Sequence, residues 1–231
     1  MTYEPRTIAY VAELFHPPVQ KDPKALQSLH SELFAGDLTG YQNFNLVPGG
    51  AQLANPVQQI GAHSTATFMP DRVQVREEFT GITLEDFSKR VEAVIAQTVE
   101  HLTIPMFTAH QCAVRTLINP RHFRDSREFI ASGMFGFGEE VIGAFDRPAQ
   151  LVGMRLVFPR SEEQSQVFAL RVESYNNDPR SLYLENVGTY PPLALNQAEG
   201  VLEEHMQETY EFLTTHALPF VAGFDRTSEE F

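Results

Sequence analysis

Residues Glu13–Leu26 read ELFHPPVQKDPKAL, and residues Thr116–Phe129 read TLINPRHFRDSREF. In both stretches an apolar run typical of a strand ends at a proline. An aspartate then precedes a run of helix-favouring residues, and aspartate is a strongly preferred residue just before a helix. Each stretch therefore predicts a strand, a short connection and the start of a helix.

The two stretches match at several positions. Three pairs of identical residues stand at the same offset of 103 residues, and they are Leu14 and Leu117, Pro17 and Pro120, and Asp22 and Asp125. A tandem duplication of one ancestral unit predicts this constant offset. Chance similarity is the alternative, because proline after a strand and aspartate before a helix are common in unrelated proteins.

The elements that follow keep the same order in both halves of the chain. After the first strand and helix, the first half predicts four strands and a long helix that begins at Thr83. The second half predicts three strands and a last helix that begins at Asn196. The strands are expected over residues 7–15, 41–47, 51–55, 63–69 and 72–79, and over 106–118, 149–158, 166–175 and 181–187.

This order predicts an α+β protein made of two tandem β-α-β(3-4)-α repeats, residues 1–104 and 105–231. Strands joined by short turns pair antiparallel, so each repeat is expected to form an antiparallel sheet. Helices would cover one face of each sheet, and a pseudo-two-fold axis would relate the repeats. The alternative is that both repeats form one continuous domain.

The element order resembles that of the TATA-box-binding-protein-like fold, in which two such units make a saddle. The strand PDRVQV (Pro70–Val75) and the long helix after EDF (Glu85–Phe87) are also similar to a sporadically distributed family of bacterial proteins of no assigned activity. The first resemblance implies a fold but no function, because one fold supports many functions. The second implies a bacterial protein and carries no role to any residue.

Composition limits the classes of partner. The chain of 231 residues has a formal net charge of −13, which repels nucleic acid and anionic membranes at long range. Its apolar runs are shorter than the roughly 20 residues that span a bilayer, and no signal-peptide pattern is present, so a cytoplasmic location is expected. The single cysteine, Cys112, lies in an apolar strand pattern and is predicted to be buried and unreactive.

Arginines gather around the predicted start of the helix at Asp125. Free backbone N–H groups and guanidinium groups at a helix start bind phosphate or carboxylate. The residues predicted to bind such a small ligand at the junction of the repeats are Arg115, Arg121, Arg124 and Arg127. The alternative is surface ion pairing with Asp125 and Glu128, which contributes only about 0–1 kcal/mol to stability.

A glycine-rich segment, GMFGFGEE (Gly133–Glu140), follows this helix start. It lacks the Lys-Ser/Thr of a P-loop and the G-x-G-x-x-G order, so a turn or hinge is expected rather than a phosphate-binding loop. Its large apolar residues Met134, Phe135 and Phe137 are predicted to line a pocket or a protein interface.

Further arginines lie on the predicted strands. In residues 72–76 two valines alternate with Arg72, Gln74 and Arg76, which is typical of a half-buried strand. The strand arginines predicted to lie at an interface are Arg72, Arg76, Arg155 and Arg171. A sheet face with these arginines could bind an anionic partner. The alternative is ion pairing across strands with Glu77, Glu78, Glu173 and Glu185.

The sequence has no catalytic or cofactor motif such as G-x-S-x-G, H-E-x-x-H or C-x-x-C. We therefore expect no metal and no cofactor, and a non-enzymatic role is favoured. An enzyme is the alternative, because catalytic groups can assemble from residues far apart in the sequence. The leading hypothesis is a protein-binding or assembly module, with a protein partner or a second copy of the chain. Binding of a small phosphate- or carboxylate-bearing ligand is the alternative, and nucleic-acid binding on the arginine-bearing sheet face comes third.

Overall fold

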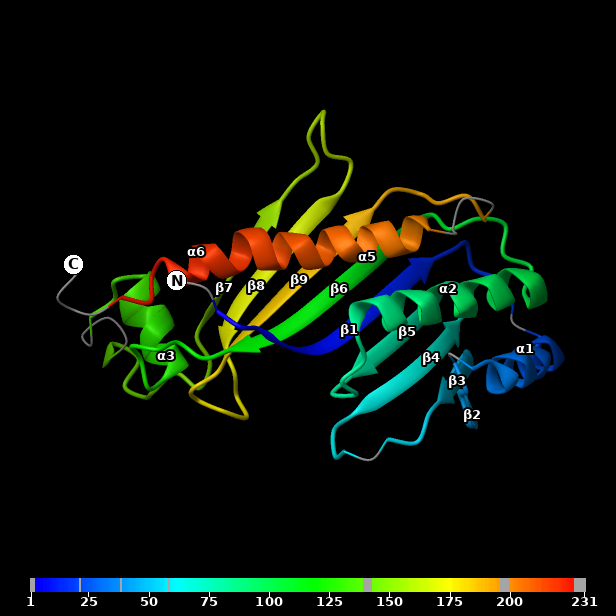
Figure 1. The fold of residues 1–231 in the computed structure, drawn as a ribbon, viewed down its shortest axis with the longest axis horizontal. Helices are drawn as coiled ribbons and strands as arrows, with labels where there is room; N and C mark the ends of the chain where they lie inside the picture. The colour runs from blue at the N-terminus through cyan, green and yellow to red at the C-terminus, as the bar shows by residue number, and fades with distance from the viewer. Residues whose placement is uncertain are drawn as a thin grey trace.

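The computed structural model describes residues 3–20, 22–37, 39–57, 59–138, 143–195 and 200–226. Within these ranges the strands form a single antiparallel sheet of nine strands, in the order β2-β3-β4-β5-β1-β6-β9-β8-β7 (Figure 1). In chain order the strands are β1 Arg6–Phe15, β2 Asn43–Val47, β3 Gly50–Ala54, β4 His63–Met69, β5 Arg72–Glu78, β6 Ala109–Ile118, β7 Gly153–Phe158, β8 Val167–Ser174 and β9 Leu182–Tyr190.

The prediction of two tandem repeats with separate sheets is wrong. β1 pairs antiparallel with β5 on one side and with β6 on the other, so both halves of the chain share one sheet. An open sheet edge leaves backbone N–H and C=O groups unpaired, and joining β1 to β6 pairs two such edges. The α+β class holds, whereas the duplication and the saddle resemblance stay predictions. The proposed boundary near residue 104 falls in the connection between α2 (Leu84–His101) and β6.

Local capping signals start the first two helices. α1 (Pro23–Ala35) follows Asp22, whose carboxylate accepts a hydrogen bond from the Lys24 backbone N–H at 3.0 Å. α2 follows Thr83, whose hydroxyl oxygen accepts a hydrogen bond from the Asp86 backbone N–H at 3.1 Å. Both caps satisfy N–H groups that have no partner inside the helix. The predicted starts of these two helices are confirmed.

The last helix continues through a proline. α5 (Val201–Glu211), η3 (Phe212–Ala217) and α6 (Leu218–Ala222) follow one another without a break, and η3 has the wider π-helical turn. Pro219 lacks an N–H and its ring crowds the carbonyl four residues earlier, which a widened turn relieves. The predicted start at Asn196 lies outside the described residues. The buried stripe of this helix includes the predicted residues Leu202, Met206, Leu213 and Ala217.

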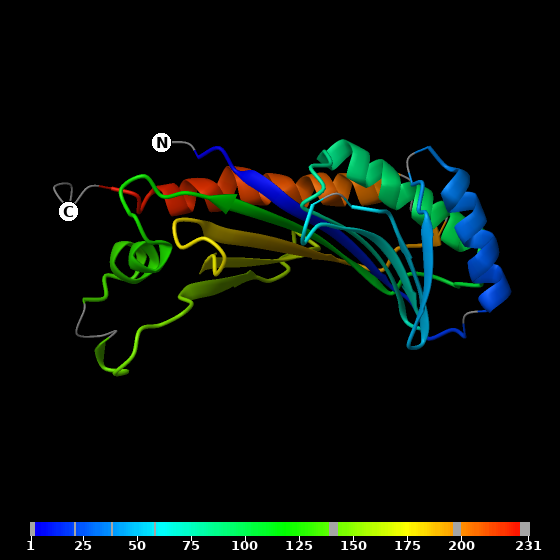
Figure 2. The ribbon, with the colours of Figure 1, turned by 90° about the horizontal axis from the view of Figure 1, so that it is seen from below.

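The principal helices lie on one face of the sheet. α2 contacts β1 and β5, α5 contacts β6 and β9, and α2 and α5 contact each other. The core between helices and sheet draws on both halves of the chain, with Leu14, Val75 and Phe87 in the same cluster as Tyr190 and Met206. The opposite face of the sheet is the inner side of an arch, with α2 and α5 on its outer side (Figure 2).

Cys112 points into this core and is 1% exposed, so the prediction of a buried thiol is confirmed. Burial raises the pKa of the thiol, because a thiolate is poorly solvated there. Over the part of the chain that the structure describes, none of the helices has the length and apolar character needed to cross a bilayer.

Candidate functional site

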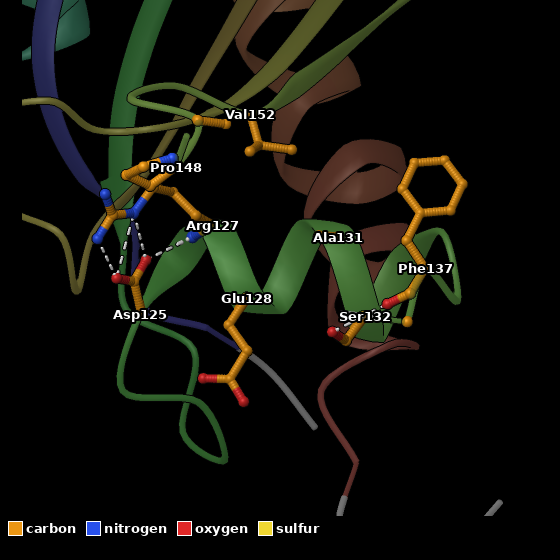
Figure 3. A pocket seen from close by; sticks show the side chains of 10 residues that line it. Asp125, Arg127, Glu128, Ala131, Ser132, Phe137, Pro148 and Val152 are labelled. Atoms are coloured by element: carbon orange, nitrogen blue, oxygen red, sulfur yellow. Dashed lines mark hydrogen bonds and ion pairs between the residues drawn. The ribbon is translucent and has the colours of Figure 1, made fainter. Parts of the chain in front are cut away.

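The predicted cluster of arginines around Asp125 has its own internal partners. α3 (Ser126–Glu128) and the π-helical segment η1 (Phe129–Met134) start after Asp125, whose carboxylate accepts a hydrogen bond from the Arg127 backbone N–H at 2.8 Å. The Arg127 side chain also donates to this carboxylate, with Nε 2.9 Å from Oδ1 (Figure 3). These hydrogen bonds hold the pKa of Asp125 below its usual value. The surface ion pair given as the alternative is therefore present for Arg127.

The other three predicted ligand-binding arginines have different settings. Arg121 donates its backbone N–H to Asp225 Oδ2 at 2.7 Å, and Arg124 is exposed in the loop before α3. Arg115 lies on β6, where its Nε donates to Glu185 Oε1 at 2.7 Å. Because Arg115 and Arg127 already have carboxylate partners, an anionic ligand would have to compete with both.

The glycine-rich segment contributes two aromatic rings to the surface. Phe135 and Phe137 are exposed, and their ring centroids lie 5.3 Å apart. Met134, predicted at an interface, instead packs against the core cluster beneath η1. Phe137 lines a cavity of about 390 Å³ together with Arg127 and Val152 (Figure 3). Gly133 to Gly138 are described, and the two glutamates that end the segment lie outside the described residues.

The strand arginines all lie on the face of the sheet that is opposite α2 and α5, which we call the open face. Their neighbours in sequence, such as Val73 and Val75, are buried under the helices. The arginines of the open face are Arg72, Arg76, Arg115, Arg155 and Arg171. The alternating pattern in residues 72–76 therefore correctly indicates a strand with one buried side.

Carboxylates of the same face pair with most of these arginines. Arg72 Nη1 lies 3.0 Å from Glu13 Oε1, and Arg76 pairs with Glu78. Glu185 accepts from Arg115 and also from Arg171 Nη2 at 3.2 Å. Cross-strand pairing, given as an alternative, is present through Glu78 and Glu185, whereas Glu173 pairs with Arg171 of its own strand. Glu77 differs, because it points to the helix side of β5.

Strand register arranges the open face into three rows that cross the strands. One row is charged and runs through Glu78, Arg115, Glu185, Arg171 and Arg155, with Ala9 of β1 between Glu78 and Arg115. A second row, which we call the apolar row, consists of Val11, Ala113, Val187, Ala169 and Val157. A third row is polar and runs through Thr67, Gln74, Glu13, Gln111 and Thr189. The apolar centre of the open face is therefore flanked by the charged row from β6 to β7 and by the polar row from β1 to β9.

Sequence reasoning missed the apolar row. Each of its members is a single small apolar residue on the half-exposed side of a strand, as Ala113 is between the buried residues Cys112 and Val114. The row exists only when β1, β6, β9, β8 and β7 are neighbours in the observed register. The signal available in the sequence was an apolar residue at an outward position in each of five strands.

A comparison with protein-family models finds no match, and a comparison with curated protein sequences finds none either.

Proposed function

We propose that this protein binds a protein partner on the open face of its sheet. The observation that carries this proposal is the apolar row, which crosses five neighbouring strands. The charged row flanks it on one side, and the polar row flanks it on the other side over β1, β6 and β9. Protein interfaces have the same arrangement, with an apolar centre and a polar rim. Val187 is half-buried and Val157 is 56% exposed, so the row still has apolar surface to bury.

The dimensions favour an amphipathic helix as the binding element of the partner. Neighbouring strands lie about 4.8 Å apart, so the apolar row from Val11 to Val157 spans roughly 19 Å. A helix of about 13 residues has the same length, and its turns repeat every 5.4 Å or so. A helix laid across the strands would thus place about one apolar residue of its stripe over each strand. The open face is concave, so the rounded surface of a helix can pack into it (Figure 2).

Charge favours a protein partner over nucleic acid. Glu13, Glu78 and Glu185 neutralise the arginines around them, and nucleic-acid binding depends on free positive charge. Arg155 lies at the β7 end of the charged row, and it has no ion pair with a residue that the structure describes. The expected partner helix therefore carries an acidic residue at the end that lies near β7.

Photo-crosslinking in cells tests the location of the site. Benzoylphenylalanine would replace Gln111, on the open face, or Gln207, on the exposed side of α5. We expect a discrete protein adduct from the Gln111 position and none from the Gln207 position. Mass spectrometry of the adduct should identify a segment with apolar residues at helical spacing. Equal adducts at both positions, or adducts to nucleic acid or to a second copy of this chain, would contradict the proposal.

A peptide made from the cross-linked segment then tests the apolar row. Its affinity for the purified protein, measured by fluorescence anisotropy, should fall at least about tenfold with Val187→Glu, because a charge would be buried against the apolar stripe. Val57→Glu is the matched control, since Val57 is exposed outside the sheet and should leave the affinity within about twofold. Equal affinities for the two variants would place the interface elsewhere.

A further inference from the structure

On the helix side of the sheet, a polar cavity of about 600 Å³ lies at the ends of β4 and β5. This volume is within the range of about 300–1,000 Å³ that is typical of small-molecule sites. Its polar lining consists of Asn55, Gln59, Ser64, Glu77, Thr80 and Arg90, and its apolar walls include Val57, Phe79 and Ile82. None of the proposed roles of the open face uses these residues.

A buried ion pair forms the floor of the cavity. Glu77 is 1% exposed and pairs with Arg90 of α2, whose Nη1 donates to Glu77 Oε1. The Ser64 hydroxyl donates to the same oxygen at 2.7 Å, and Asn55 Nδ2 donates to Ser64 Oγ at 3.1 Å. A buried ion pair of this kind is costly to desolvate and is weak evidence for stability by itself. A binding role would account for its place beside a cavity.

The second carboxylate oxygen of Glu77 lacks a hydrogen-bond partner among the described residues, although an ionised carboxylate accepts several hydrogen bonds. Buried polar atoms without a partner are uncommon in folded proteins. Glu77 lines the cavity, so a ligand hydroxyl that reaches this oxygen would supply the missing donor. The floor of the cavity thus retains capacity to accept a hydrogen bond from a ligand.

The cavity wall is held in an uncommon backbone conformation. Phe79 has a φ of 52°, a left-handed value that is an outlier for a bulky residue, and its N–H donates to Ile8 O at 2.7 Å. Such a conformation costs of order 1–3 kcal/mol and persists where surrounding contacts impose it, often at binding sites. Here it places the aromatic residue at the wall beside the polar floor.

We infer that this cavity binds a neutral polyhydroxyl ligand, such as a monosaccharide. Because Arg90 already neutralises Glu77, a neutral ligand adds no uncompensated charge to the buried floor. The lining offers an acceptor from Glu77 and donors from the Gln59 amide and the Thr80 hydroxyl, and each ligand hydroxyl both donates and accepts. The Phe79 and Ile82 side chains give the carbon-bound face of the ligand an apolar wall.

Titration of the ¹⁵N-labelled protein with D-glucose, D-ribose and myo-inositol, followed by NMR, tests this inference. With at least one probe, at concentrations up to about 50 mM, we expect saturable shifts of the Ser64, Phe79 and Gly81 amides. Glu77→Gln should weaken binding at least about tenfold. If that variant unfolds, Thr80→Val at the exposed rim serves instead, with a loss of about threefold or more.

Two salts and one variant far from the cavity serve as controls. Choline chloride and sodium sulfate should leave the same amides unshifted, and Glu32→Gln on the exposed side of α1 should bind the probes as the unchanged protein does. The inference fails if none of the three polyols shifts these amides. It also fails if a salt shifts them and the polyols do not, or if Glu77→Gln and Thr80→Val both bind normally.

Discussion

His110 Nε2 on β6 lies 2.7 Å from His205 Nδ1 on α5, and this hydrogen bond joins the sheet to the helix above it. One ring donates and the other accepts, so the pair requires at least one neutral histidine. Both rings stack on Tyr190, with centroid distances of 5.3 Å for His110 and 3.9 Å for His205. Burial, followed by the proximity of His205, lowers the pKa of His110 to about 4, and burial lowers that of His205.

Acid should therefore destabilise the fold through these histidines. Their pKa is lower in the folded than in the unfolded chain, so the unfolded chain binds more protons below pH 6.5 or so. The free energy of unfolding should fall as the pH drops from about 6.5 toward 4, and His110 alone contributes about 2 kcal/mol between pH 7.5 and 5. Urea unfolding at the two pH values measures this change.

The variant His110→Gln isolates the contribution of the histidine pair to the pH dependence of stability. Glu208, near the same cluster, has a pKa raised by burial, so its protonation acts in the opposite direction. His110→Gln should reduce the difference between the two pH values, whereas His63→Gln, on the exposed end of β4, should not. An unchanged pH dependence in His110→Gln would show that the pair does not control acid stability.

Gly188 permits the close packing of Tyr190 and α5 against β9. A Cβ at this position would lie 2.6 Å from Thr209 Oγ1 and 2.7 Å from the Tyr190 ring. Gly188→Ala should therefore lower the free energy of unfolding by about 1–3 kcal/mol, measured by urea denaturation. Gly143→Ala is the control, because a Cβ there meets no described atom within 4 Å. Equal stabilities of the two variants would contradict this packing.

Asp225, after the last helix, joins three segments of the chain. Its carboxylate accepts hydrogen bonds from the Tyr3 hydroxyl at 2.7 Å and from the backbone N–H groups of Arg121 and His122 at 2.7 and 3.0 Å. Asp225→Ala leaves these donors without their acceptor and should cost about 2–4 kcal/mol. Tyr3→Phe removes one donor and should cost about 1 kcal/mol. Thermal unfolding compares the two, and a larger loss with Tyr3→Phe would contradict this assignment.

Glu185 accepts from two arginines of the open face, Arg115 and Arg171. Glu185→Gln should lower the free energy of unfolding by about 1 kcal/mol, because two half-buried guanidinium groups lose a charged partner. Glu173→Gln should cost less, since the Glu173 carboxylate lies 3.7 Å from Arg171. Urea unfolding at low and high salt measures both, and the Glu185 effect should shrink at high salt. An effect that grows with salt would argue against an electrostatic origin.

Features that depend on neighbouring residues in the sequence were predicted well. Asp22 and Thr83 start helices because their side chains reach backbone N–H groups two or three residues later. The alternation of Val73 and Val75 with arginines indicated which side of β5 is buried. These signals act within one element, so they do not depend on which strands become neighbours.

Features that depend on distant residues were missed. The pairing of β1 with β6 joins residues about 100 positions apart, and no pattern inside either strand names its neighbour. The apolar row requires five strands in register, and Asp225 accepts hydrogen bonds from Arg121 and His122, which are 104 and 103 positions earlier in the chain. The Asp125–Arg127 pair was foreseen as an alternative because its residues are close in sequence.

The central position of β1 has a consequence for the order of events during synthesis. β1 lies between β5 and β6, yet β6 ends at Ile118, so one edge of β1 stays unpaired in a growing chain until that residue has left the ribosome. Pairings between distant segments form slowly, and an exposed strand edge attracts other chains. Newly made N-terminal fragments that stop before β6 should therefore aggregate or engage chaperones. Once β6 is made, the exposed edge becomes that of β6, and it stays unpaired until β9 has been synthesised.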